Sequence, residues 1–153
     1  MTMPDDLLAH NRQLIEQFRA DGGASMQDRP LLLLTTKGRK SGKPRTSPIM
    51  YARSEDRLLV IASNNGAPRN PQWYANLLAD PQVTVELPGS VFAATAVPLS
   101  GADYDREWER VVSRYPFFAE HQRKAGDRKI PIVELPRSSG LIVLGCLPAG
   151  RIR

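Results

Sequence analysis

The chain has 153 residues, of which 41% are apolar, 24% are charged and 7% are aromatic, and its formal net charge is +5. This composition suits one globular domain spanning residues 1–153 and excludes a disordered or collagen-like chain. The single cysteine, Cys146, cannot form an internal disulfide, and no apolar run approaches the roughly 20 residues that a transmembrane helix needs. Because the N-terminus lacks the features of a signal peptide, a cytoplasmic location is predicted.

The first predicted element is an amphipathic helix over residues 5–20, which ends before Gly22 and Gly23. Its apolar stripe consists of Leu7, Leu8, Leu14, Ile15 and Phe18. The charges on this helix are of both signs, which favours packing against a core or another subunit. Peripheral contact between residues 5–20 and a membrane remains the alternative.

Short apolar and alternating runs follow, and they predict a largely antiparallel sheet. The predicted strands span residues 31–36, 46–53, 57–63, 82–87, 91–97 and 130–135. Helices are predicted at 72–78, 103–114 and 117–124, with Asn70 capping the first and a capping box at Ser100 before the second. Because hairpins rather than βαβ units join the strands, the predicted fold class is α+β, a mostly antiparallel barrel or twisted sheet with an N-terminal helix and inserted helices.

The positive charge is concentrated in one part of this pattern. Residues 31–60 carry a net charge of +5, and the charges of the remaining segments cancel. Five cations lie within nine residues that contain no acid, and they are Lys37, Arg39, Lys40, Lys43 and Arg45. An unbalanced cluster of this kind predicts contact with an anionic partner.

The loop over residues 38–48 has the composition of an anion site. Its glycines permit a tight turn, its hydroxyls can form hydrogen bonds, and Arg39 and Arg45 can bind phosphate or carboxylate oxygens bidentately. A solvated basic hairpin is the alternative interpretation. A nucleic-acid surface is disfavoured, because the loop has no aromatic residue for base stacking and the chain has no recognition motif.

A second polar segment follows the third predicted strand. Residues 62–76 join a glycine-containing turn to a helix N-terminus, whose free amides attract anions or carbonyl oxygens. Together, the two segments predict a ligand with a charged tail and a flat polar ring. Common catalytic motifs are absent, and His10 and His121 have no metal-ligand spacing with other residues, so no metal site is predicted.

Five segments occur in a specific order: Leu33 to Arg45, Asn70 to Leu77, Asp80-Pro81, Tyr115-Pro116 and Ile130 to Val133. In this order and spacing, over about residues 7–135, they resemble the deazaflavin-dependent nitroreductase family. Members of this family have a split β-barrel fold and bind coenzyme F420. The resemblance implies an F420H2-dependent oxidoreductase that transfers a hydride to an electron-poor small molecule such as a quinone, an activated enone or a nitro compound.

Two alternatives to this function stay open. FMN could occupy the same barrel, or the chain could be a coenzyme- or nucleic-acid-binding module without turnover. The tail over residues 136–153 extends past the matched region, and its segment 141–145 could form an edge strand or reach another subunit of a homodimer.

The resemblance also implies three groups of cofactor-binding residues. The phosphate and polyglutamate tail would be bound by Arg39, Lys40, Ser41 and Arg45. The segment beside the ring system would be Thr46, Ser47, Pro48, Ile49 and Met50. The walls around the deazaflavin would be Ile61, Ala62, Ser63 and Asn64 on one side, and Gln72, Trp73, Tyr74 and Asn76 on the other.

Two catalytic residues are implied in the same way, Ser63 to orient the acceptor and Tyr115 to donate a proton or form a pocket wall. Phe118 and His121 would share the substrate pocket with Tyr115, at positions where nitro-drug-activating members have tyrosines. This loss of hydroxyl groups favours quinone or enone reduction over reduction of bulky nitroimidazoles. His121 could supply a proton near neutral pH, and a surface histidine is the alternative.

Overall fold

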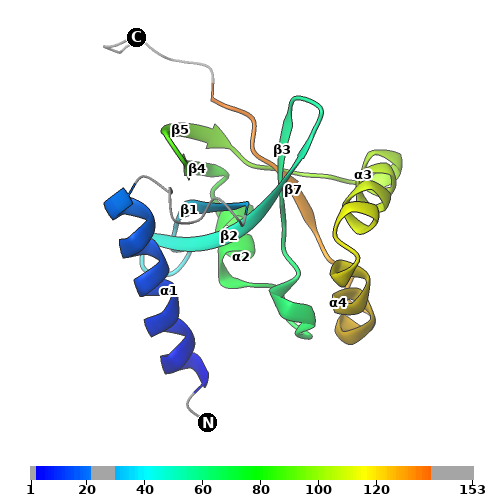
Figure 1. The fold of residues 1–153 in the computed structure, drawn as a ribbon, viewed down its shortest axis with the longest axis horizontal. Coiled ribbons are helices and arrows are strands. Elements are labelled where there is room, and N and C mark those ends of the chain that lie inside the picture. The colour runs from blue at the N-terminus through cyan, green and yellow to red at the C-terminus, as the bar shows by residue number, and fades with distance from the viewer. Residues whose placement is uncertain (1–2, 22–29, 139–153) are drawn as a thin grey trace.

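The computed structural model describes residues 3–21 and 30–138, and the side chains of residues 3–10 are outside this description. Within these ranges, the chain forms a curled seven-stranded antiparallel sheet with helices on two sides (Figure 1). The strands are β1 (Leu31–Lys37), β2 (Pro44–Ser54), β3 (Arg57–Ile61), β4 (Gln82–Leu87), β5 (Ser90–Thr95), β6 (Val97–Pro98) and β7 (Ile132–Glu134). The helices are α1 (Met3–Asp21), the 3-10 turn η2 (Asn64–Gly66), α2 (Gln72–Ala79), α3 (Gly101–Arg114) and α4 (Phe117–Ala125).

The strand order is β5-β4-β1-β2-β3-β7-β6, and the long strand β2 joins the two halves of the sheet. Its residues 44–50 pair with β1, and its residues 51–54 pair with β3. The segment after β7 returns to β5, where Ala94 bridges Arg137 and the N–H of Ser138 donates to the carbonyl oxygen of Ala93 at 2.9 Å. The sheet therefore curls back on itself into a split barrel.

Alternation along the strands places apolar side chains on both faces of this sheet. Leu32, Leu34 and Val60 are fully buried inside the barrel, whereas Leu33 faces outward and packs against Phe18 of α1. Leu59 likewise faces outward, into a second apolar cluster beneath α3 and α4. The sheet thus has α1 on one side and the α3–α4 pair on the other (Figure 1).

Arg57 connects α3 to the sheet through ion pairs. Its guanidinium contacts Asp103 Oδ1 at 2.8 Å, Glu107 Oε2 at 3.0 Å and Glu134 Oε1 at 2.9 Å. Hydrogen bonds to Asp103 and then Glu134 raise the pKa of Arg57, and the same contact lowers the pKa of Asp103. These charged groups fix α3 over the end of the sheet that lies away from the basic loop.

The predicted fold class is confirmed, and each predicted helix and strand within the described residues has a counterpart. The strand predicted over 91–97 is wrong in one respect, because it breaks at Ala96, whose N–H donates to the carbonyl oxygen of Pro81 at 2.8 Å. This bond turns the chain from β5, beside β4, to β6, beside β7. The predicted edge strand over 141–145 and Cys146 lie outside the described residues.

The cap predicted at Asn70 is also wrong, whereas Ser100 is the N-cap of α3 as predicted but without the predicted capping box. Pro71, not Asn70, is the N-cap of α2, and Asn70 instead accepts a hydrogen bond from Arg128. α3 does begin after Ser100, but the hydroxyl of Ser100 forms no capping hydrogen bond. None of the helices in the described ranges combines the length and apolar character required to cross a membrane.

Candidate active site

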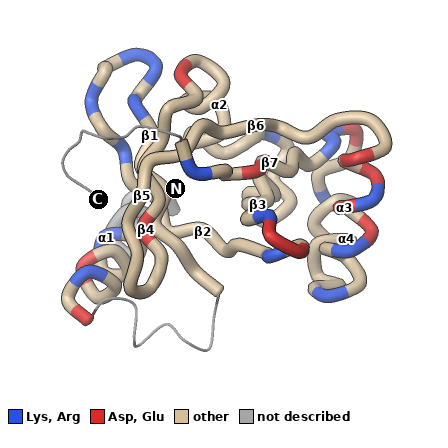
Figure 2. Tube along the Cα trace, turned by 90° about the horizontal axis from the view of Figure 1, so that it is seen from above, with Lys and Arg blue, Asp and Glu red and all other residues tan. Residues whose placement is uncertain are grey.

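The connection between β1 and β2 is a tight turn that carries the basic cluster. The N–H of Gly38 donates to the carbonyl oxygen of Lys43, and the N–H of Gly42 donates to that of Gly38, each at 2.8 Å. Gly42 has φ +72°, a left-handed conformation that glycine adopts without steric cost. Figure 2 shows the resulting loop as a group of Lys and Arg residues without acidic residues among them.

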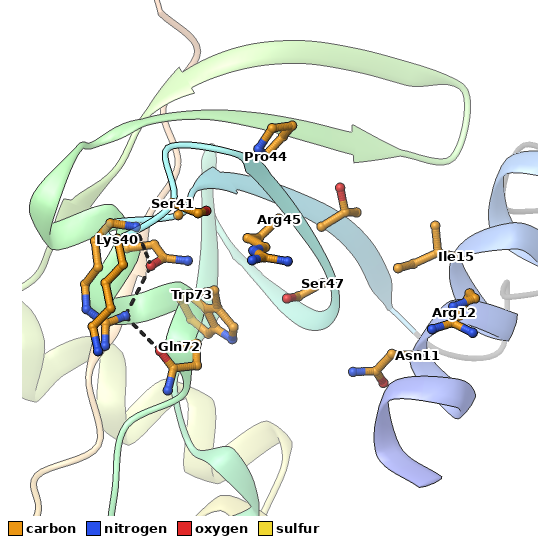
Figure 3. Close-up of a pocket in the computed structure, with 14 residues that line it drawn as sticks. Asn11, Arg12, Ile15, Lys40, Ser41, Pro44, Arg45, Ser47, Gln72 and Trp73 are labelled. Atoms are coloured by element: carbon orange, nitrogen blue, oxygen red, sulfur yellow. Dashed lines mark hydrogen bonds between the residues drawn. The ribbon is translucent and has the colours of Figure 1, made fainter. Parts of the chain in front are cut away.

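Side-chain amides of α2 hold this loop in place. The N–H of Arg39 donates to Asn76 Oδ1 at 3.2 Å, and its guanidinium donates to Gln72 Oε1 at 2.8 Å (Figure 3). The amide nitrogen of buried Asn76 in turn donates to Thr36 Oγ1 at 3.1 Å. Arg39 therefore positions the loop against α2, whereas Lys40 and Arg45 form no ion pair or hydrogen bond with any described side chain.

A cavity of about 670 Å³ lies between this loop, β2, α2 and α1 (Figure 3). It is lined by Asn11, Arg12, Ile15, Gly38, Arg39, Lys40, Ser41, Pro44, Arg45, Thr46, Ser47, Gln72, Trp73 and Asn76. Four of these residues are cations, and no described acidic residue lines the cavity. Because no carboxylate neutralises the positive charge, the cavity favours an anionic ligand.

A second cavity, of about 600 Å³, adjoins the first and shares Asn11, Ser47, Gln72 and Trp73 with it. Its other lining residues are Pro48, Ile49, Met50, Ile61, Ser63, Asn64, Asn65, Arg69, Asn70, Pro71, Phe117, Phe118 and His121. The aliphatic and aromatic members form walls, and the polar members, nine of the 17 lining residues, can orient a ligand. The two cavities together form a cleft with a cationic end and a second end that has aliphatic and aromatic walls, which we call the apolar end.

Ser63 and His121 meet in the apolar end. The hydroxyl of Ser63 lies 3.2 Å from Nδ1 of His121, and only 8% of Ser63 is exposed. Burial lowers the pKa of His121, and the charge of Lys124 lowers it further, so the imidazole is neutral at neutral pH. Phe117 and Phe118 pack edge-on against this ring, with centroid distances of 5.5 and 5.8 Å.

The turn η2 allows α4 to approach Ser63 closely. Three successive residues have positive φ: Asn64 at 50°, Asn65 at 56° and Gly66 at 80°. A Cβ atom on Gly66 would lie 2.9 Å from the carbonyl oxygen of His121. A glycine at this position therefore lets α4 pack directly on the turn, which brings His121 within reach of Ser63.

Arg128 holds the segment 62–70, which contains Ser63 and η2, through hydrogen bonds. Its guanidinium donates to the carbonyl oxygens of Ala62 at 3.0 Å, Ser63 at 2.6 Å and Ala67 at 2.9 Å, and to Asn70 Oδ1 at 2.6 Å. Burial lowers the pKa of Arg128 from its usual value, although the guanidinium stays charged. One side chain thus connects both ends of the segment that carries Ser63.

The structure brings most of the predicted site residues together. The first cavity includes Arg39, Lys40, Ser41, Arg45, Thr46, Ser47, Gln72, Trp73 and Asn76, and the second adds Pro48, Ile49, Met50, Ile61, Ser63, Asn64, Phe118 and His121. Among the described residues, no group of histidine, cysteine and acidic side chains could hold a metal ion.

Three predicted site residues line neither cavity. Ala62 is fully buried in the barrel. Tyr74 packs edge-on against Trp73 at 6.4 Å and partly on the core, where burial raises its pKa. Tyr115, at the end of α3, packs on the second apolar cluster, and the Arg114 guanidinium lies 5.5 Å from its ring centroid.

Several cleft residues are absent from the sequence prediction. Those lining the cavities outside the predicted segments 38–48 and 62–76 are Asn11, Arg12, Ile15 and Phe117. The three α1 residues belong to a helix whose apolar stripe predicted only packing. Arg128, which holds the Ser63 segment, was also missed, because it lies in a charged run, 127–129, that is typical of solvent-exposed sequence. Only the folded arrangement reveals their positions.

Comparisons with known proteins match most of the chain. A family model described as F420H(2)-dependent quinone reductase matches residues 9–136. The F420H(2)-dependent quinone reductase Rv1261c of Mycobacterium tuberculosis (strain ATCC 25618 / H37Rv) is 39% identical over 110 residues, which cover 71% of this chain and 74% of that protein.

Two solved structures are also similar. One is described as F420-H2 dependent reductase (FDR-A), with a TM-score of 0.63 and 39% identity, covering 70% of this chain and 94% of that chain. The other is described as a domain-swapped dimer, with a TM-score of 0.65 and 36% identity, covering 86% of this chain and 98% of that chain.

Proposed function

The chain belongs to the F420H(2)-dependent quinone reductase family, and on this premise we propose that it is an oxidoreductase that uses F420H2 to reduce a quinone-like small molecule. The observation that carries the proposal is the cleft with one cationic, acid-free end and one apolar end. An anionic tail and a flat ring are the two chemical parts of coenzyme F420, and each matches one end.

The cationic end fits the tail of this coenzyme better than the single phosphate of FMN. The side chains of Arg12, Lys40 and Arg45 form no ion pair or hydrogen bond with another described residue, so all three charged groups are available for ligand oxygens. A phosphate followed by glutamate carboxylates can use several such cations at once. The apolar end then accommodates the ring beside Trp73 and the 46–50 segment, as the resemblance to the family implies.

The protein's contribution to the reaction is orientation, exclusion of water and proton supply. When bound, reduced F420 supplies a hydride. Holding both reactants in one apolar cavity can lower the barrier by about 7–11 kcal/mol when they are well oriented. Phe117, Phe118 and Met50 form walls that restrict water at this end of the cleft.

Reduction of a quinone by a hydride also requires a proton at a carbonyl oxygen. In the proposed mechanism, the hydroxyl of Ser63 donates a hydrogen bond to this oxygen, and the protonated form of His121, whose Nδ1 lies 3.2 Å from that hydroxyl, supplies the proton. Because the pKa of His121 is lowered, this form is populated at mildly acidic pH rather than at neutral pH. Tyr115, the donor implied by the family resemblance, lies outside both cavities, which favours His121 in this role.

The test of the proposed function is a titration followed by turnover. Purified protein should quench the fluorescence of oxidised F420 at micromolar concentrations, and it should oxidise F420H2 when menadione is added. Absence of quenching would reject the proposal. Tighter binding of FMN than of F420 would favour the flavin alternative, and binding without turnover would favour a non-catalytic module.

His121→Gln is expected to lower saturated turnover by about 10- to 100-fold, because general acid catalysis contributes at least this much. Since the pKa of His121 is lowered, wild-type turnover should fall as pH rises through that lowered value, and the variant should lose this dependence. Steady-state rates with menadione from pH 5 to 8 give the measurement.

Tyr115→Phe is the matched control, because it removes the hydroxyl implied by the family resemblance without altering the cavities. Its pH profile should remain that of the wild type. If Tyr115→Phe lost turnover and His121→Gln kept wild-type turnover, Tyr115 would be the proton donor instead.

The oligomeric state, membrane contact, location and domain extent of the chain stay proposals. A relative of 36% identity is described as a domain-swapped dimer, which supports a second copy of this chain as a partner. Light scattering on the purified protein would measure this. Peripheral membrane contact through residues 5–20, a cytoplasmic location and a single reductase domain over residues 1–153 rest on the sequence.

A further inference from the structure

Helix α1 forms a wall of the cationic cavity opposite the basic loop. Asn11, Arg12 and Ile15 line this cavity, and Asn11 lines the apolar cavity as well. In Figure 3 these side chains lie across the cavity from Arg45 and Ser47. The polar side chains of Asn11 and Arg12 therefore lie where a ligand in this cavity can contact them.

Contacts one to two turns farther along α1 hold this wall in place. Phe18 is 3% exposed and packs on Leu33 of the outer face of β1. Arg19 donates to both carboxylate oxygens of Glu86 on β4, at 3.1 and 2.8 Å. Because residues 12, 15 and 19 are spaced three and four apart, they lie along one side of the helix. The anchors thus determine where Arg12 points.

Arg12 is an available cation in this position. Its side chain is exposed, and it has no hydrogen bond or ion pair with a described residue. Across the cavity, Lys40 and Arg45 are available in the same way, and the described lining includes no acid. Three cations that repel one another around a shared space indicate a ligand with more than one negative charge.

We propose that α1 is part of the coenzyme site and that Arg12 binds the anionic tail of F420 from the side opposite the basic loop. This inference rests on the proposed function, and it concerns the tail rather than the ring. Arg12 therefore selects for coenzyme that carries the phosphate and glutamates over the ring fragment FO, which has the deazaflavin and ribityl groups but no tail.

The experiment compares the affinities of F420 and FO by fluorescence titration of wild-type protein and of Arg12→Gln. The dissociation constant for F420 is expected to rise about three- to tenfold, as for loss of a charge-assisted contact, whereas that for FO should remain unchanged. Raising the ionic strength should reduce the difference for F420, because salt screens a partly exposed charge.

Two further variants control for indirect effects. Gln17→Glu lies on the same helix, is exposed, does not line the cavity, and changes the net charge by the same amount as Arg12→Gln. It should bind F420 as the wild type does. Arg45→Gln removes a cation from the loop side and should show the same selective loss of F420 affinity.

The outcomes separate this inference from the proposed function. Unchanged F420 affinity in Arg12→Gln, an equal loss for FO, or an equal loss in Gln17→Glu would each overturn the role of Arg12 while leaving the reductase assignment intact. Failure of the wild-type protein to bind F420 would overturn both. Retained FO binding in Arg12→Gln also shows that the variant is folded.

Discussion

Replacing Gly66 with alanine is expected to lower the free energy of unfolding by about 2–5 kcal/mol and to reduce turnover sharply. A left-handed conformation costs a non-glycine residue about 1–2 kcal/mol, and Gly66 has φ +80°. The new methyl group would also lie 2.9 Å from the carbonyl oxygen of His121 and 2.8 Å from Cβ of Lys124. Overpacking of this kind costs about 1–3 kcal/mol more.

Relief of that crowding would require α4 to move away from η2, which would separate His121 from Ser63. The matched control is Gly89→Ala, because Gly89 has φ +78° but no neighbouring atom within 4 Å of the position that a methyl group would take. Gly89→Ala should therefore show the backbone cost alone, with unchanged turnover. Urea unfolding of both variants measures the difference, and equal losses of stability would show that α4 tolerates the added methyl group.

Local patterns in the sequence account for most of the fold. Val83, Val85 and Leu87 alternate as a half-buried strand requires, and the turn at 88–89 joins this strand to the next. The break at Ala96 was not predictable, because no glycine or proline interrupts the alternating run there. It depends on the carbonyl oxygen of Pro81 and on closure of the barrel, which are tertiary features.

The cationic end of the cleft could be predicted from charge alone, whereas the apolar end could not. Tyr115, Phe118 and His121 follow one another at similar spacing, so the sequence does not show which of them reaches the cavity. The structure separates them because α3 ends at Arg114 and α4 starts at Phe117. Tyr115 lies at this junction, and His121 lies on α4, above Ser63.

The role of Arg128 could not be predicted from the sequence. Its neighbours Asp127 and Lys129 are exposed, so the three charges together indicated a solvated turn. In the structure, Arg128 donates to three backbone carbonyl oxygens and to Asn70. An arginine whose fork binds several carbonyl oxygens is a positioning residue, and only three-dimensional contacts distinguish it from a surface charge.

Arg128→Ala is expected to lower saturated turnover by about 10- to 100-fold, because displacement of a reacting group by about 1 Å can cost this much. The segment from Ala62 to Asn70 would lose its common partner, and the hydroxyl of Ser63 would no longer be fixed beside His121. Stability should fall by about 2–4 kcal/mol, since hydrogen bonds to a charged group contribute about 1.5–3 kcal/mol each and are not additive.

Arg128→Lys and Arg123→Ala separate positioning from charge. Lysine keeps the positive charge, but its single ammonium group cannot reproduce the planar fork, so most of the turnover should still be lost. Arg123 is exposed and pairs with Glu120 on the same helix, and its removal should change stability by less than about 1 kcal/mol and leave turnover unchanged.

The affinity for F420 gives the decisive readout for Arg128. Its loop lines only the apolar end of the cleft, whereas the cations that suit the tail line the other end. Turnover should therefore fall much more than F420 affinity in both Arg128 variants. If Arg128→Lys kept wild-type turnover while Arg128→Ala lost only stability, the fork would serve folding alone, and Ser63 would be positioned by its other neighbours.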